Sequence, residues 1–107
     1  MANLVLGTKI KQLRKEKGYT LQQLADLIGS GKSYIWEIEN RGLKRPSAEK
    51  LALIANALDV TTDFLINNDQ VEISEDENKE IFYRKLGRLK KEDQEKIMDM
   101  IEAWGKK

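Results

Sequence analysis

The sequence predicts an all-α protein in which five short helices are followed by a pair of amphipathic helices. Apolar residues recur at intervals of three and four along most of the chain, which is the spacing of a helix face. Only one proline interrupts that pattern. A length of 107 residues fits one small domain with an appended element.

The composition excludes several classes of function. The chain has no cysteine and no histidine, so a disulfide framework, a thiolate or imidazole metal site and histidine-based catalysis are excluded. Its apolar runs are short, and no charged segment precedes an apolar one as in a signal peptide. We therefore expect a cytoplasmic protein that is not membrane-bound, is not an enzyme and needs no cofactor.

The net charge of +1 conceals a division along the chain. Residues 1–66 hold ten Lys and Arg against seven Asp and Glu, whereas residues 67–107 hold nine against eleven. A mildly basic first part is compatible with phosphate contacts, but many solvated helical proteins have the same balance.

The first predicted helix covers residues 4–17. Leu6, Ile10 and Leu13 fall on one face of it. Gly18 follows as a stop signal, because glycine enters the left-handed conformation after a helix without strain.

The pattern of residues 19–40 predicts two helices joined by a turn that contains glycine. Thr20 and Gln23 have the spacing of a reciprocal cap at the start of the first. Gly29 to Gly31 interrupts the apolar pattern, and Ile35 and Ile38 restart it. This is the layout of a helix-turn-helix, whose second helix, here about residues 31–40, enters the major groove of double-stranded DNA.

The face of this second helix opposite the two isoleucines is polar. At 100° per residue it collects Lys32, Ser33, Trp36, Glu37 and Asn40, with Tyr34 and Glu39 on the flanks. A cation, a hydroxyl, a carboxylate and an amide can meet base edges or phosphates, although an ordinary solvated face would look similar. A tryptophan opposite the core favours a contact with DNA or with a protein partner.

The chain then predicts a basic loop and two more helices. Residues 41–46 carry three cations. Ser47 is placed to cap a helix that buries Leu51, Ile54 and Leu58, and Thr61 to cap a short fifth helix.

From residue 67 the composition becomes acidic. Residues 67–78 read as a solvated linker or as the acidic first turn of a helix, and Val71 and Ile73 allow a short strand. Residues 79–107 predict two amphipathic helices, as a hairpin or as one bent helix. Because such a pair has little core of its own, its stripes must be buried by a second copy of the chain, which we favour, or by the first five helices. The proposed dimerisation residues are Phe82, Leu86, Leu89, Ile97, Met98, Ile101 and Trp104.

Four segments in order resemble the Cro/C1-type helix-turn-helix family of phage repressors and xenobiotic-response-element-like regulators. They are LGTKIKQLRKEKGYTLQQLA, KSYIWEIEN, KRPSAEKLALIANALDV and TTDFLINN. The resemblance covers residues 4–66 and implies a five-helix, lambda-repressor-like DNA-binding domain over residues 1–66.

The resemblance also implies roles for individual residues. Lys32, Ser33 and Glu37 stand where the family reads bases, and we add Trp36 from the same face. Arg14 and Glu39 look like the family's salt bridge, which orients the reading helix. The residues expected to contact phosphate are Thr20, Gln22, Tyr34, Asn40, Arg41, Lys44 and Arg45.

Three positions depart from the family pattern. Trp36 is bulkier than is typical at its position. Leu21 replaces a glutamine that touches phosphate in many members, and Thr20 and Gln22 are expected to substitute for it. Ser30 replaces the usual apolar residue of the turn.

The predicted function is a sequence-specific transcriptional regulator, a homodimeric repressor that reads a two-fold related operator. A regulatory protein partner is a further expectation. The alternative is a protein-interaction module, such as an antitoxin or an adaptor, built on the same fold.

Overall fold

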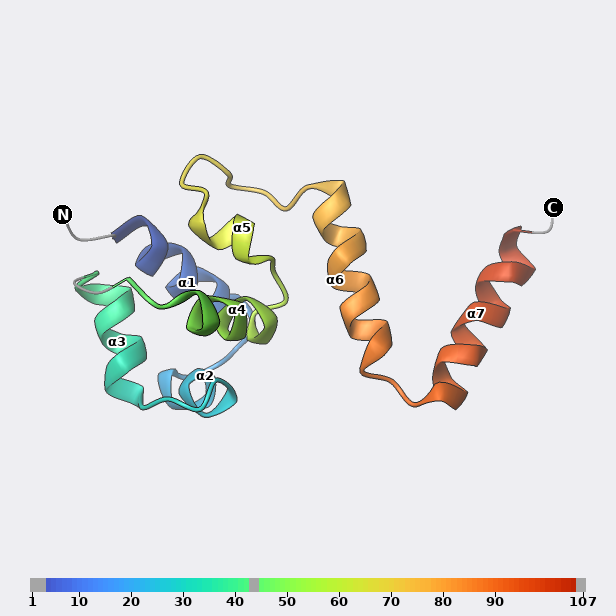
Figure 1. Ribbon diagram of the computed structural model, residues 1–107, viewed down its shortest axis with the longest axis horizontal. Helices are drawn as coiled ribbons and strands as arrows, with labels where there is room; N and C mark the ends of the chain where they lie inside the picture. Colours follow the sequence, from blue (N-terminus) through green and yellow to red (C-terminus); the bar gives the residue numbers. More distant parts are fainter. Residues whose placement is uncertain (1–3, 43–44, 106–107) are drawn as a thin grey trace. The chain divides into compact units, whose positions relative to one another are not determined.

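The computed structural model describes residues 4–42 and 45–105, and all regular secondary structure in these ranges is α-helical. The chain divides into two compact units, Met1–Ile73 and Ser74–Lys107. The first unit contains α1 (Leu4–Glu16), α2 (Leu21–Leu27), α3 (Lys32–Asn40), α4 (Ala48–Ala57) and α5 (Thr62–Ile66). The second contains α6 (Glu75–Gly87) and α7 (Lys91–Gly105), so the predicted fold class is confirmed (Figure 1).

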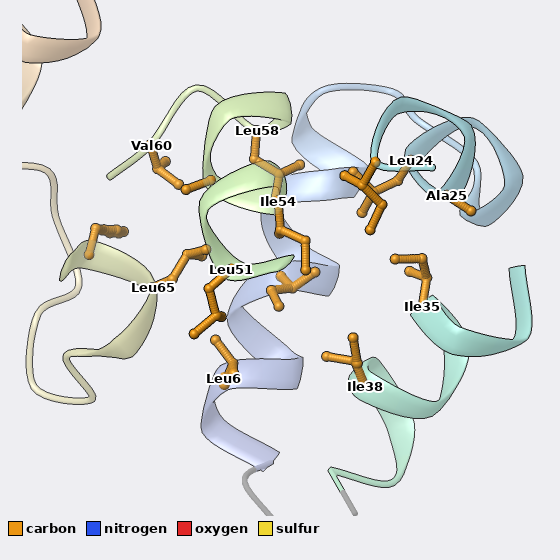
Figure 2. Packing of buried hydrophobic residues seen from close by; sticks show 14 residues of the cluster. Leu6, Leu24, Ala25, Ile35, Ile38, Leu51, Ile54, Leu58, Val60 and Leu65 are labelled. Atoms are coloured by element: carbon orange, nitrogen blue, oxygen red, sulfur yellow. The ribbon is translucent and has the colours of Figure 1, made fainter. Parts of the chain in front are cut away.

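The first unit is built around one apolar core to which all five helices contribute (Figure 2). Ile10 from α1, Leu24 from α2 and Ile54 from α4 are completely buried. Ile35 and Ile38 point into this core from α3, as the helical spacing predicts. They leave the opposite face of α3 turned away from the core.

Side-chain caps set where these helices begin. The Thr20 hydroxyl accepts from the Gln23 N–H at 3.0 Å, and the Gln23 carboxamide accepts from the Thr20 N–H at 2.8 Å. The hydroxyls of Ser47 and Thr61 likewise accept from the N–H three residues later. All three predicted caps are therefore present.

The segment after α5 lies against α1. The Lys9 ammonium donates to the carbonyl oxygens of Phe64, Asn67 and Gln70 at 2.5, 3.0 and 2.7 Å. Ile73 packs on the core. No strand forms at Val71–Ile73. In this stretch the Glu72 carbonyl oxygen accepts from the Gln70 carboxamide at 2.9 Å.

Helix α6 begins earlier than the sequence pattern indicates. The Ser74 hydroxyl accepts from the Glu77 N–H, and the Glu77 carboxylate accepts from the Ser74 N–H. This reciprocal cap starts the helix at Glu75. The helix therefore begins before residue 79, and of the two alternatives for the acidic segment, the acidic first turn of a helix is the one that forms at residues 75–78.

The second unit consists of two separate helices joined by a turn. The Gln94 carboxamide donates to the carbonyl oxygens of Leu86 and Leu89 at 2.8 and 3.1 Å, which satisfies acceptors at the end of α6. None of the helices in either described range has the length and apolar composition needed to cross a bilayer.

Candidate nucleic-acid interface

The exposed face of α3 brings together the residues predicted to read bases. Lys32, Ser33, Trp36 and Glu37 are all exposed. With Arg41, just beyond the helix, they line a shallow hollow of about 410 Å³. A cation, a hydroxyl and a carboxylate on one helix face can address several base edges at once.

Trp36 forms the apolar part of this surface. Its side chain is 43% exposed, and the Arg41 guanidinium lies 5.4 Å from the centroid of its ring. A cation at this distance from an indole is attracted by the negative face of the ring. The pair therefore presents an aromatic surface together with a positive charge, a combination suited to bases and backbone phosphates.

An ion pair beneath α3 fixes its C-terminal end. The Arg14 guanidinium donates to the two carboxylate oxygens of Glu39 at 2.7 and 3.0 Å, and its third contact is the Tyr19 carbonyl oxygen at 2.8 Å. Both residues are buried. One guanidinium thus joins α1, the segment before α2 and α3, as the resemblance implies.

The Glu39 carboxylate raises the pKa of the Arg14 guanidinium above its ordinary value, despite the opposing effect of burial. Because the pKa is raised in the folded state, the free energy of unfolding that this cation contributes is fully present at pH values below the ordinary arginine pKa. It is lost only as the pH rises through the raised pKa. Arg14 therefore stays charged across the pH range in which DNA binding is measured.

Gly7 also positions α3, and the sequence alone does not reveal it. A Cβ atom at this position would overlap the Ile38 carbonyl oxygen and lie 3.0 Å from that of Glu39. Helix α1 therefore approaches the backbone of α3 directly. A glycine inside a helix is unfavourable by itself, and this close approach explains its presence.

Two of the residues expected to contact phosphate make hydrogen bonds within the protein. Gln22 donates to Asp26 at 2.8 Å, and the Asn40 amide donates to the Trp36 carbonyl at 2.9 Å. Burial raises the pKa of the Tyr34 phenol above its ordinary value, which keeps its hydroxyl protonated and able to donate. Lys44 lies outside the described residues.

The other residues expected to contact phosphate lie at the surface. Thr20 and Arg45 are exposed, as is Arg41 beside Trp36. The hydroxyl oxygen of Thr20 accepts a backbone hydrogen bond in the cap of α2, and its own hydrogen can still donate to an anion.

Comparisons with known proteins agree with this geometry. A family model described as helix-turn-helix matches residues 10–65. The transcriptional regulator SinR of Bacillus licheniformis is 43% identical over 63 residues, which are 59% of this chain and 57% of that protein. The chain thus spans little more than half of that relative.

Two solved structures are similar to the described fold. One is SinR, master regulator for biofilm formation, in complex with DNA, with 42% identity and a TM-score of 0.55 over 58% of this chain and 98% of that one. The other is a complex of SinR with SinI, with 28% identity and a TM-score of 0.57 over 95% of this chain and 99% of that one.

Proposed function

Because the chain belongs to the Cro/C1-type helix-turn-helix family, we propose that it is a sequence-specific transcriptional regulator that reads double-stranded DNA with α3. One observation carries the proposal. The exposed face of α3 has base-reading chemistry at Lys32, Ser33 and Glu37, and buried contacts hold the helix in place from behind. The similar SinR structure is a complex with DNA.

Each class of residue makes a different kind of contact. Lys32 donates to guanine O6 or N7, Glu37 accepts from cytosine N4, and Ser33 tolerates several bases. Trp36 packs on the DNA beside them. The phosphates are contacted by Thr20, Gln22, Tyr34, Asn40, Arg41, Lys44 and Arg45, which fix the register without reading sequence.

Substitutions on α3 and in the basic loop are expected to differ in kind. Glu37→Ala should reduce discrimination at one base pair of the operator half-site by about 1–3 kcal/mol. Arg45→Ala should weaken binding to all sequences and lower the slope of log K against log salt by about 0.9. Selection of bound sites from a random DNA pool, followed by salt titrations on the selected site, measures both effects. Equal loss of discrimination in the two variants would contradict this division of roles.

We propose that the protein acts as a homodimer through α6 and α7. Their large apolar side chains remain exposed in the single chain, including Phe82 at 47%, Ile101 at 44% and Trp104 at 71%. Leu86, Leu89, Ile97 and Met98 complete the proposed interface. A single helix-turn-helix covers one half-site, and a dimer reads two half-sites about 34–36 Å apart.

A charge on the apolar stripe of α7 is expected to break the dimer. Ile101→Glu in the full chain should shift the mass measured by light scattering from dimer to monomer, because a carboxylate in an apolar interface costs several kcal/mol. Ala103→Glu adds the same charge about 160° away around the helix and should leave the dimer intact. A monomeric wild-type chain, or equal effects of the two variants, would contradict the proposed interface.

Repression is the proposed direction of regulation, because a dimer across both half-sites would block polymerase at a promoter that overlaps them. We propose a regulatory protein as the second occupant of the same apolar stripes, because one similar structure is a complex of SinR with another protein, SinI. A chain that stays folded but retards no DNA at low salt would favour this alternative, a protein-interaction module such as an antitoxin or an adaptor.

A further inference from the structure

Lys50 on α4 links three parts of the helix-turn-helix unit. Its ammonium donates to the Ser30 hydroxyl oxygen at 2.8 Å and to the Ile28 carbonyl oxygen at 3.4 Å. It also lies 6.0 Å from the centroid of the Tyr34 ring. These groups belong to the end of α2, the turn and the first part of α3. A lysine 20 residues beyond the turn thus fastens the turn to α4.

The position of the ammonium is electrostatically favourable. Ile28 is the C-cap of α2, where carbonyl groups lack helical partners and the helix dipole is negative. The hydrogen bonds of Lys50 are partly buried, so solvent screens them less than a surface contact. A charged donor also strengthens the bond to the serine hydroxyl.

Ser30 lies between the Lys50 contact and the start of α3. Its backbone N–H donates to the Ala25 carbonyl oxygen at 2.9 Å, which ties the turn to α2. Its side chain ties the same residue to α4 through Lys50. The next residue, Gly31, is the N-cap of α3 and provides no side-chain cap. Ser30, one residue before this N-cap, is therefore tied to both α2 and α4, and its hydroxyl stands where the family has an apolar side chain.

From these contacts we infer that Lys50 is a positioning residue for DNA reading. Through Ser30 it sets the angle at which α3 leaves the turn, and through Tyr34 it orders a side chain on the flank of the reading face. The inference rests on the proposed function. It differs from the phosphate contacts above because Lys50 acts on α3 and not on the DNA.

Salt dependence separates the two roles of a lysine. A lysine bound to phosphate releases counterions, and its removal lowers the slope of log K against log salt by about 0.9. A lysine that only positions α3 leaves the slope unchanged when it is removed. The variants are Lys50→Met, Ser30→Ala and the double variant, with Lys15→Met as control, because Lys15 is exposed on α1 and loses the same charge.

The selected operator should bind Lys50→Met and Ser30→Ala about tenfold more weakly than wild type, as expected for a lost charge-assisted hydrogen bond. The double variant should be no weaker than Lys50→Met, and the salt slope should stay at the wild-type value in all three. Lys15→Met should change affinity less than twofold. A slope reduced by about 0.9 in Lys50→Met, additive losses in the double variant, or unchanged affinity would overturn the inference.

A second measurement does not depend on DNA. In the full chain free of DNA, Lys50→Met should shift the amide NMR signals of residues 28–34 and the ring signals of Tyr34, while Lys15→Met should leave them in place. Unchanged signals in folded Lys50→Met would overturn the inference. If the wild-type chain binds no DNA, the proposed function fails, and this measurement alone decides whether Lys50 holds the turn.

Discussion

Gly7→Ala should destabilise the first unit by about 2 kcal/mol or more and weaken DNA binding with it. The added methyl group would overlap the carbonyl oxygen of Ile38 and press on that of Glu39. Both are backbone atoms, so no side chain can move aside and α1 must separate from α3. Alanine favours the helix by about 1 kcal/mol over glycine, and this gain only partly offsets the overlap. Urea unfolding followed by circular dichroism measures the loss.

The same substitution at Gly87 is the matched control. Gly87 is the last residue of α6, and nothing lies within 4 Å of a Cβ built there. Gly87→Ala should therefore be neutral or stabilise the chain by up to about 1 kcal/mol. A Gly7→Ala variant as stable as Gly87→Ala, with unchanged DNA affinity, would mean that α1 and α3 do not approach as closely as described.

Local patterns explain why much of the fold could be predicted. The spacing of Ile35 and Ile38 indicates the buried side of α3, and it therefore also indicates the exposed side. Thr20 and Gln23 act within one helical turn, so their cap is visible in the sequence. The ion pair of Arg14 with Glu39 came from the resemblance, because a separation of 25 residues carries no local signal.

The features that were missed depend on how separate elements meet. Gly7 looks like a weak point in α1 until its distance from the α3 backbone is known. Lys9 and Lys50 look like solvated charges, yet each donates to groups 20 or more residues away. The start of α6 stayed undecided in the sequence, because acidic residues fit both a linker and a first helical turn.

Among these variants, Glu39→Gln is expected to lower the free energy of unfolding most, by about 3–5 kcal/mol. The substitution keeps the size of the side chain but removes its charge, which leaves the Arg14 guanidinium buried without a counter-charge. The free energy of unfolding of a domain of this size is about 5–15 kcal/mol in total, so the variant should unfold at a much lower urea concentration than wild type. Lys17→Gln is the control, because Lys17 pairs with Asp59 at an exposed site. This substitution should lower the free energy of unfolding by less than about 1 kcal/mol.

The double variant Arg14→Met, Glu39→Leu separates the two roles of the pair. Apolar residues in place of both charges remove the uncompensated charge, so much of the stability lost in Glu39→Gln should return. DNA affinity should not return with it, because the guanidinium that joins α1, the Tyr19 carbonyl and α3 is gone. Recovery of both would show that the pair serves stability alone. Recovery of neither would show that the loss in Glu39→Gln has a cause other than the buried charge. Stability without affinity is the result expected of an ion pair that orients the reading helix.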